Sequence, residues 1–276
     1  MDLQTSPASP LLGVIGAGNL AGAVIRGLLG AKFCASDAII ASQPDAALRE
    51  SFARETGVTV VADNAEVARR ADVIFVGVKP SVVLPVLREI GDLLVGKLVV
   101  SLAAGVRIAS MEALSAARFL RVMTNLPAAI GEGATAFARG SRTTENDAAK
   151  VRALFSAIGV LVEVEEAQID AVTALGGSGP AFVYSVIEAF ADGGVAEGLS
   201  PEVALALAAQ MMRGAARLVS TSGKTPEELR RMVVTPGGTT AAGLAVFGRE
   251  NTARDLADAI RAAAARGREM ASESSS

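Results

Sequence analysis

The chain has 276 residues, enough for one large domain or two of ordinary size, and 51% of them are hydrophobic and 20% charged, as in a packed globular protein. A net charge of −3, with no basic run or aromatic cluster, gives no electrostatic case for a nucleic-acid partner. The chain has no histidine and Cys34 is its only cysteine, which excludes histidine-based catalysis, an intrachain disulfide and a cysteine-rich zinc site, so no metal is expected.

The stretch from Leu3 to Ile25 carries no charge and raises the question of a signal peptide or a membrane span. Asp2 stands where a signal peptide has basic residues, prolines interrupt the early part, and the apolar part is rich in glycine. Two later uncharged runs are each cut by Gly-Gly and Pro. We therefore expect a soluble cytoplasmic protein with no membrane partner.

A glycine-rich turn follows the first predicted strand. The segment "LLGVIGAGNLAGAVIRGLL" predicts a short strand at about Leu11 to Ile15, a turn at Gly16-Ala17-Gly18 and a helix from about Asn19 to Leu29. Such glycines permit a tight turn and the close approach of a pyrophosphate to the amides at the start of the helix. Ala21 fills the third small position, where helix and strand pack closely. Many glycine-rich turns bind nothing, but this one has the preceding strand and following helix that the dinucleotide motif requires, so we predict a nucleotide site.

Strands and helices then alternate along the chain. The apolar runs that predict further strands are AIIAS, VTVV, DVIFVGV, KLVVSLAAGV and RFLRVMTN, with helical segments between most of them. This alternation predicts an α/β fold with a doubly wound, mostly parallel sheet, whose ligand crevice lies at the carboxyl ends of the strands. Those ends carry Gly16 to Gly18, Ser42-Gln43, Val78-Lys79, Ala103-Ala104 and Asn125.

The end of the second strand decides between NAD and NADP. A carboxylate there would bind the adenosine ribose diol and favour NAD. Asp37 precedes this strand, at the wrong end, and Ser42-Gln43-Pro44 follow it, so NADP(H) is the preferred cofactor and NAD(H) remains possible. No arginine stands at the tip, but Arg49 is a candidate within reach of the 2′-phosphate. A solvated loop lysine is one explanation of Lys79; its place after a strand favours a contact with the cofactor or its ribose.

From about Ala167 onward the pattern is helical. Ser200 precedes Pro201 as an N-cap before a proline at the first helical position, and Thr225 and Glu228 have capping-box spacing. The predicted helices carry small apolar faces rich in Ala, Gly and Met. Such faces suit a dimer interface and a monomer core equally, and the sequence does not separate the two.

Two glycine-rich stretches are predicted to interrupt these helices. They are "ALGGSGPAF", Ala174 to Phe182, and "VVTPGGTTAAGL", Val233 to Leu244. A glycine inside a helix costs about 1 kcal/mol relative to alanine. A plain connector between helices is one explanation of each stretch. In both, however, hydroxyl groups stand beside glycines at a predicted helix start, an arrangement suited to a carboxylate.

In their order and spacing these segments resemble pyrroline-5-carboxylate reductase, the family of the last enzyme of proline biosynthesis. The resemblance runs from about Leu12 to Met270 and lies in "IGAGNLAGA", "FVGVKP", "SLAAGV", "RVMTNLP", "IDAVTALGGSGPAF", "ADGGVAEGL" and "VVTPGGTTAAGL". Four residues depart from the usual pattern of the family, each removing or shifting a hydroxyl: Leu126, Gly176, Val234 and Thr235. The core Gly237-Gly238-Thr239-Thr240 is intact.

The resemblance implies a Rossmann-type domain and a helical domain that interlocks with a second subunit, in homodimers that commonly assemble further into decamers. We place the dinucleotide-binding domain at residues 11–164 and the helical dimerisation and substrate domain at 165–272, between tails at 1–10 and 273–276 that are predicted to be disordered.

The resemblance also implies a site for pyrroline-5-carboxylate, a cyclic imino acid, whose carboxylate is held by amides and hydroxyls of the second glycine-rich stretch. The expected substrate-binding residues are Ser178, Gly237, Gly238, Thr239, Thr240 and Ala241, with Thr240 as the catalytic candidate. The expected cofactor-binding residues are Ile15, Gly16, Ala17, Gly18, Asn19, Leu20, Ser42, Gln43, Asn64, Val78, Lys79, Pro80, Ala103, Ala104, Asn125 and Glu166.

The implied reaction agrees with the missing histidine. Reduction of a carbonyl needs a proton donor for the developing alkoxide, but a cyclic imine can bind already protonated. Hydride transfer to the iminium carbon then leaves a neutral amine, and catalysis consists mainly of positioning and electrostatics. Thr240 is expected to donate a hydrogen bond near the ring nitrogen and to orient the substrate.

The sequence argues against three other classes of protein. A β-hydroxyacid dehydrogenase carries a catalytic lysine shortly after its second glycine-rich segment, and "GGSGPAFVYSVIEAF" has none. A short-chain dehydrogenase needs Tyr and Lys four residues apart, but Tyr184 is followed at that spacing by Glu188. A non-catalytic NADP-sensing protein has no need of an imino-acid pocket, and the intact "PGGTT" therefore argues against it.

Overall fold

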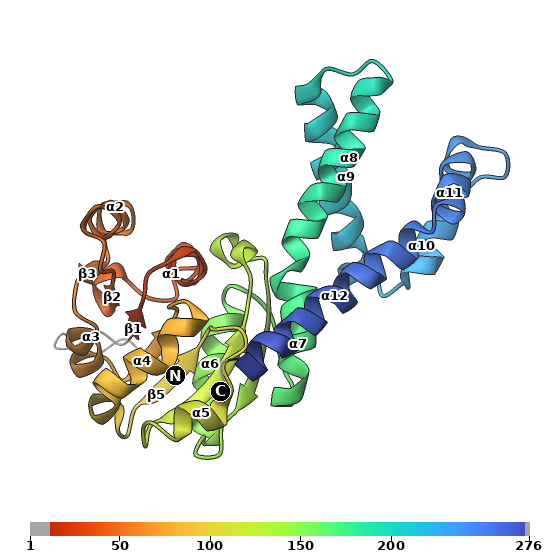
Figure 1. The fold of residues 1–276 in the computed structure, drawn as a ribbon. Helices are drawn as coiled ribbons and strands as arrows, with labels where there is room; N and C mark the ends of the chain where they lie inside the picture. Colours follow the sequence, from red (N-terminus) through yellow and green to blue (C-terminus); the bar gives the residue numbers. More distant parts are fainter. Residues whose placement is uncertain (1–11, 274–276) are drawn as a thin grey trace. The chain divides into compact units, whose positions relative to one another are not determined.

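The computed structural model describes residues 12–273 (Figure 1). The predicted tails lie outside the described residues, apart from Glu273 at the end of the last helix. The chain divides into two compact units. The first unit comprises the residues up to Ser178 and those from Ala263 onward, and the second unit is Gly179–Ala262.

The first unit contains an eight-stranded sheet in the order β3-β2-β1-β4-β5-β6-β7-β8. Its strands are β1 (Leu12–Ile15), β2 (Ile39–Ser42), β3 (Thr59–Val61), β4 (Val73–Val76), β5 (Leu98–Ser101), β6 (Arg118–Met123), β7 (Gly133–Arg139) and β8 (Gly159–Glu163). All neighbouring strands run parallel except β6 and β7, which are antiparallel. The predicted α/β class and doubly wound, mostly parallel sheet are therefore confirmed.

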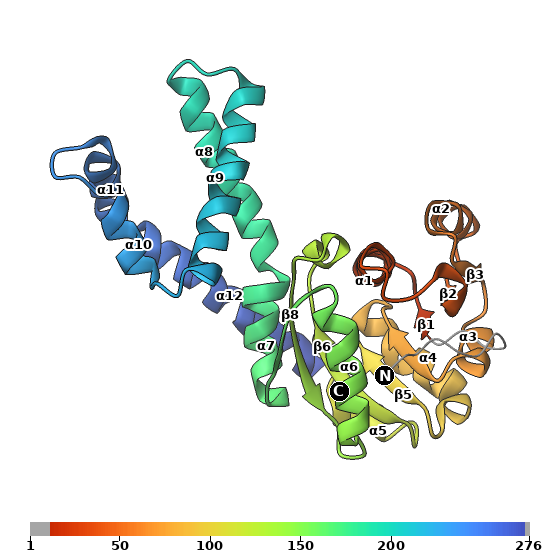
Figure 2. The same ribbon diagram turned by 180° about the vertical axis from the view of Figure 1, so that it is seen from behind.

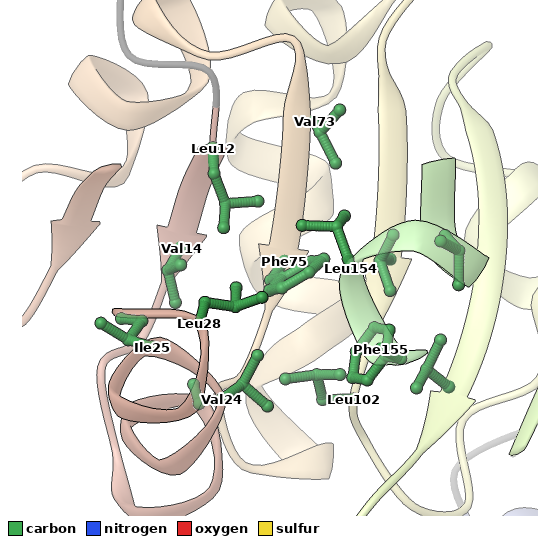
Figure 3. Close-up of a cluster of buried hydrophobic side chains, with 14 of the residues drawn as sticks. Leu12, Val14, Val24, Ile25, Leu28, Val73, Phe75, Leu102, Leu154 and Phe155 are labelled. Carbon is green, nitrogen blue, oxygen red and sulfur yellow. The ribbon is translucent and has the colours of Figure 1, made fainter. Parts of the chain in front are cut away.

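The central strands are buried on both faces because helices cover the sheet from both sides. Successive residues of β4 point to opposite faces, so Phe75 joins one apolar cluster and Ile74 the other. The first cluster packs α1 (Asn19–Gly30) and α6 (Glu145–Ser156) against the sheet. Phe75 and Phe155 lie in this cluster with ring centroids 5.7 Å apart (Figure 3). The second cluster packs α3 (Asn64–Arg70), α4 (Pro80–Ile90) and α5 (Ile108–Glu112) on the opposite face.

The helices of the first unit are α1 (Asn19–Gly30), α2 (Ala46–Thr56), α3 (Asn64–Arg70), α4 (Pro80–Ile90), α5 (Ile108–Glu112), α6 (Glu145–Ser156) and α7 (Ile169–Val172). Three of them, α2, α3 and α6, begin at a residue whose side chain accepts from an amide of the first turn. Asp45 caps α2, Asp63 caps α3, and Thr144 forms a capping box with Asp147 at the start of α6. These caps set the point at which each strand-to-helix connection ends.

The structure adds β7, α6 and β8, which the sequence analysis did not name. β8 is an edge strand beside α6 (Figure 2), and its outward residues Val160 and Val162 are exposed. β8 has no buried residue, whereas β7 is buried continuously from Thr135 to Ala138. The edge strand therefore lacks the buried run that marks a central strand.

The second unit is helical, as predicted. Its helices are α8 (Gly179–Ala196), α9 (Pro201–Thr221), α10 (Pro226–Val233), α11 (Thr239–Arg249) and the first part of α12 (Thr252–Glu273). Ser200 caps α9 by accepting from the amide of Val203, and Thr225 and Glu228 form the predicted capping box of α10. Within residues 12–273, no helix is long and apolar enough to cross a membrane.

The stretch "ALGGSGPAF" interrupts the regular α-helix, as predicted, but it does so through a π-helix and not through an open loop. α7 passes into a π-helix at Thr173–Gly177, and α8 begins at Gly179. The Ser178 amide donates to the carbonyl of Thr173 at 2.8 Å, so the glycines widen a helical turn by one residue instead of ending the helix. Single-turn π-helices of this kind occur often at functional sites.

Candidate functional site

The glycine turn after β1 has the geometry of a phosphate cradle. Gly16 has a φ of 85°, and a Cβ there would lie 2.6 Å from Val78 Cγ1, so glycine is required. A Cβ at Gly18 would meet no atom of the described residues within 4 Å, so space above the turn is open. Gly18 is the N-cap of α1 and has no side chain to bond the first amides of the helix. Those amides are available to an anion.

Helix α1 lies close to the sheet behind this turn. A Cβ at Gly77, which follows β4, would lie 2.6 Å from the Cβ of Ala21. The Gly77 amide also donates to the carbonyl of Ile15 at 2.8 Å. The prediction that Ala21 marks a close contact of helix and strand is confirmed, and this contact keeps the start of α1 against the crevice.

Ser42 and Asn64 tie two neighbouring strand ends to the turn. The hydroxyl of Ser42 accepts from the Gly16 amide at 3.1 Å and donates to Asn64 Oδ1 at 2.7 Å. The Ser42 carbonyl accepts from the Ala17 amide at 2.9 Å. The structure therefore brings these predicted cofactor residues together, with the buried Ser42 hydroxyl as the link between turn and side-chain amide.

The tip of β2 presents an amide side chain. Gln43 Nε2 donates to the Ala17 carbonyl at 3.5 Å, and Gln43 Oε1 accepts from the Asp45 amide at 3.3 Å. The Asp45 carboxylate caps α2 by accepting from the Leu48 amide at 2.9 Å, so it is used locally. Asp37 lies before β2, at the opposite end. A neutral tip of this kind suits a 2′-phosphate better than a carboxylate does.

Arg49 supports the same tip from α2. Its Nη1 donates to the carbonyls of Gln43 and Pro44 at 2.9 and 3.2 Å. The guanidinium thus holds the backbone of the turn after β2, and its remaining donors are the part of the group that can meet an anion.

A pocket of about 170 Å³ adjoins the glycine turn. It is lined by Ala17, Gly18, Asn19, Arg26, Gln43, Leu48, Ser51, Phe52 and Glu55. The Arg26 guanidinium lies 5.1 Å from the centre of the Phe52 ring and pairs with Glu55, which raises the pKa of Arg26 and lowers that of the carboxyl. The positive charge of Arg26 beside this pocket is therefore already neutralised. The groups that remain for binding the predicted dinucleotide are the amides at the start of α1 and Gln43.

The other strand-end residues lie where the topology predicts. Val78 packs over Gly16, and Lys79 is exposed at the N-cap of α4, with Pro80 at the first helical position. Ala103 is buried just beyond β5, and Asn125 follows β6. The predicted cofactor residues from six strand ends thus share the carboxyl edge of one sheet.

Glu166, also expected at the cofactor, is engaged in a buried ionic cluster. Its carboxylate accepts from the Ile108 amide at 2.7 Å and lies 3.7 Å from Arg121 Nη1. Arg121 is fully buried and pairs with Asp170 at 3.2 Å, as does Arg107 at 3.0 Å. Burial lowers the pKa of Arg121, and Asp170 opposes that shift. Sequence reasoning missed this cluster, although an arginine inside the apolar strand "RFLRVM" was a signal for it.

The second glycine-rich stretch presents a helix start to solvent. Gly237 has a φ of 72°, and Gly238 is the N-cap of α11 with extended backbone. Because Gly238 has no side chain, the first amides of α11 receive no bond from their cap residue. Thr239 and Thr240 are exposed in this first turn, and Ala241 is half-buried. Exposed amides and hydroxyls at the positive end of a helix dipole are an arrangement suited to an anion such as a carboxylate.

Ser178 lies in the first unit, between the π-helix and α8, whereas the residues from Gly237 to Ala241 belong to the second unit. Other reactive groups are scarce. Burial raises the pKa of the Cys34 thiol, which makes it a poor nucleophile at neutral pH. Among residues 12–273, no group of three His, Cys, Asp or Glu side chains could hold a metal ion.

The parallel sheet, the glycine turn and the strand ends around it define a Rossmann-type, dinucleotide-dependent oxidoreductase. Family models give the same class. Residues 11–105 match the model described as NADP oxidoreductase, coenzyme F420-dependent, and residues 166–270 match that for pyrroline-5-carboxylate reductase dimerisation.

Individual relatives extend the match over nearly the whole chain. The pyrroline-5-carboxylate reductase of Arabidopsis thaliana is 40% identical over 273 residues, which is 98% of this chain and 99% of the relative. Pyrroline-5-carboxylate reductase 2 of Homo sapiens is 40% identical over 95% of this chain and 84% of the relative. The crystal structure of the Plasmodium falciparum enzyme with NADP bound has a TM-score of 0.88 at 29% identity, covering 96% of this chain and all (100%) of that one.

The chain belongs to the pyrroline-5-carboxylate reductase family, a family of NAD(P)H-dependent oxidoreductases. The family and enzyme class expected from the sequence are thereby confirmed.

Proposed function

We propose that this protein reduces 1-pyrroline-5-carboxylate to L-proline with NADPH, the last step of proline biosynthesis. The observation that carries the proposal is the start of α11, where Gly238 leaves the first amides without a cap and Thr239 and Thr240 stand exposed beside them. A substrate with one carboxylate fits this anion site, and the glycine turn of the first unit supplies the dinucleotide site.

Two sets of residues would bind the two anionic groups, which are the dinucleotide pyrophosphate and the substrate carboxylate. The amides at the start of α1, with Ser42, Gln43 and Asn64 beside them, would hold the dinucleotide, whose nicotinamide supplies the hydride when bound. The amides and hydroxyls of Thr239 and Thr240 would hold the substrate carboxylate and so orient the ring. A protonated imine needs no general acid, which agrees with a chain that has no histidine.

NADPH is proposed as the preferred cofactor, with NADH as a possible substitute. The neutral tip of β2 supports this preference, because Gln43 carries no charge that would repel a 2′-phosphate. The NADP bound to the Plasmodium falciparum relative supports the same choice.

We propose that residues 165–272 act as a dimerisation and substrate-binding domain in a homodimer, and that dimers assemble further, as a decamer. The family model for dimerisation spans residues 166–270. Many large apolar side chains of α8, α9 and α11 are exposed, which supports a partner chain on these helices. A cytoplasmic location is part of the same proposal, because proline biosynthesis uses soluble substrates and cofactors.

Oxidation of NADPH by the purified protein, with and without pyrroline-5-carboxylate, tests the activity. Thr240→Val keeps the side-chain volume and removes the hydroxyl. The loss of a hydrogen bond to a charged group, about 1.5–3 kcal/mol, should lower kcat/KM about ten- to a hundredfold and leave NADPH affinity unchanged. Thr221→Val is the matched control, since the Thr221 hydroxyl donates to Arg217 at the end of α9. The carboxylate role is falsified if Thr240→Val keeps kcat/KM within about twofold, or if NADPH affinity falls equally.

A further inference from the structure

Asn125 joins two backbone segments through the two ends of its side-chain amide. Its Nδ2 donates to the carbonyl of Gly176 at 2.9 Å, and its Oδ1 accepts from the amide of Ala134 at 3.1 Å. Both partners are backbone groups of fixed polarity, so the orientation of the side-chain amide is determined. Only 7% of Asn125 is exposed, and the bonds are therefore little weakened by water.

The carbonyl of Gly176 has lost its ordinary helical partner. In an α-helix this oxygen would accept from the amide four residues later, but that residue is Pro180, which has no N–H. The Ser178 amide has moved to the carbonyl of Thr173, as the π-helix requires. Asn125 Nδ2 supplies the donor that the helix itself cannot provide.

The turn that Asn125 holds lies beside the sheet. A Cβ at Gly177 would lie 3.2 Å from Met123 Sδ, and a Cβ at Gly176 would lie 3.6 Å from the Ala134 carbonyl, an ordinary van der Waals distance. A shift of the π-helix along the sheet would stretch both bonds of Asn125. The residue that follows this turn is Ser178, which the sequence analysis expects among the substrate-binding residues.

We propose that Asn125 is a positioning residue, which clamps the Thr173–Gly177 turn to the ends of β6 and β7 and so fixes the backbone at Ser178. This inference rests on the proposed function only for the role of Ser178. It assigns to Asn125 a different task from the cofactor contact that its place at a strand end suggests. The donor it supplies is needed because Pro180 follows the two glycines.

A double-mutant cycle tests the clamp. Asn125→Asp at pH 8 keeps the oxygen that faces Ala134 and replaces the donor to Gly176 by an acceptor. Pro180→Ala restores a backbone N–H that can reach the Gly176 carbonyl. We expect Asn125→Asp to speed hydrogen exchange of the Ser178 amide about tenfold or more, Pro180→Ala alone to change it little, and the double variant to recover most of the loss. Asn146→Asp, at an exposed position of α6, is the matched control.

Binding and turnover separate the possible roles of Asn125. The clamp predicts that Asn125→Asp leaves the Kd for NADPH within about twofold and lowers kcat/KM for pyrroline-5-carboxylate, with recovery in the double variant. Loss of NADPH affinity without faster exchange would show a cofactor contact, and equal loss in the Pro180→Ala background would show a role unrelated to Gly176. Either result overturns the clamp. If Asn125→Asp does not fold, Asn125→Ala in both backgrounds gives the same comparison.

The exchange and NADPH measurements need no turnover. A wild-type protein that fails to reduce pyrroline-5-carboxylate would contradict the proposed function, whereas the exchange result would still support or overturn the clamp.

Discussion

The two units of this chain differ in how far they bury their apolar side chains. In the first unit, strands β1, β2, β4 and β5 are buried along their whole length, and helices cover both faces of the sheet. In the second unit, Ala204 and Ala208 are the buried hydrophobic residues among those described, although its helices carry many leucines, valines and phenylalanines. The first unit has its own core, and the second has apolar faces without one.

This difference assigns a task to each unit. A self-contained sheet with fixed strand ends can position a dinucleotide before any partner arrives, as the bonds among Gly16, Ser42 and Asn64 show. Helices that expose apolar faces become stable only when another surface covers them. We therefore expect the stability of the second unit to depend on association with a partner chain, and the stability of the first unit not to depend on it.

The largest effect is expected from a charge on the apolar faces of the second unit. Leu207 in α9 is 58% exposed, and Leu48 in α2 is 59% exposed, so the two leucines form a matched pair. Leu207→Glu should weaken the dimer by at least about 3 kcal/mol, more than about a hundredfold in Kd, because a carboxylate would be buried at the interface. Leu48→Glu should leave association unchanged. Sedimentation over a range of concentrations checks both, and equal behaviour of the two variants would remove the distinction between the units.

The glycine turn offers a second matched pair. Gly16→Ala should destabilise the first unit by about 1–3 kcal/mol, because it combines a φ of 85° with a Cβ 2.6 Å from Val78. Gly18→Ala should leave Tm unchanged, since its Cβ enters open space and its φ is −81°. It should nevertheless weaken NADPH binding if the pyrophosphate occupies that space. Thermal unfolding and NADPH titration of the two variants separate folding from binding, and unchanged NADPH affinity in Gly18→Ala would contradict the cradle.

Charge at the tip of β2 should change cofactor preference without changing stability. Gln43→Asp places a carboxylate beside the predicted 2′-phosphate and should weaken NADPH about tenfold while affecting NADH little. Gln43→Asn shortens the side chain equally but stays neutral, so it controls for the lost bonds to Ala17 and Asp45. Equal losses for both cofactors, or tighter binding of NADH than of NADPH by the wild type, would rule out the preference.

The smallest effect is expected at a helix cap of the second unit. Thr225→Ala removes the capping-box bonds to Glu228 and should cost about 1 kcal/mol of helix stability. If the second unit depends on association, the loss should appear as weaker dimerisation and not as a separate unfolding transition. Calorimetry at two protein concentrations distinguishes the two results.

Local rules on the sequence were sufficient for most of the fold. The apolar runs predicted the central strands, and Ser200, Thr225 and Glu228 marked helix starts that the structure confirms. The glycine turn was found from its flanking strand and helix. Edge strand β8 was not found; its sequence has the apolar run Val160 to Val162, but both valines are exposed in the structure.

The same local rules did not predict hydrogen bonds between segments that are distant in sequence. The two glycines before Ser178 indicated a break, whereas a π-helix forms there, supported from Asn125 fifty-one residues earlier in the chain. Glu166 was expected at the cofactor, but its carboxylate accepts from the Ile108 amide and lies near Arg121. Both of these groups belong to segments that are distant from Glu166 in sequence. Residue type and local spacing identify candidate site residues. Tertiary contacts decide which of these residues make structural bonds and which stay available to a ligand.

The end of α12 has a consequence for synthesis on the ribosome. The residues of this helix from Ala263 onward belong to the first unit, where Met270 and Ala271 pack against Gly105. A nascent chain has made the whole sheet and all of α8 to α11 before these contacts can form. The first unit therefore reaches its final packing only after the association surface of the second unit has been translated.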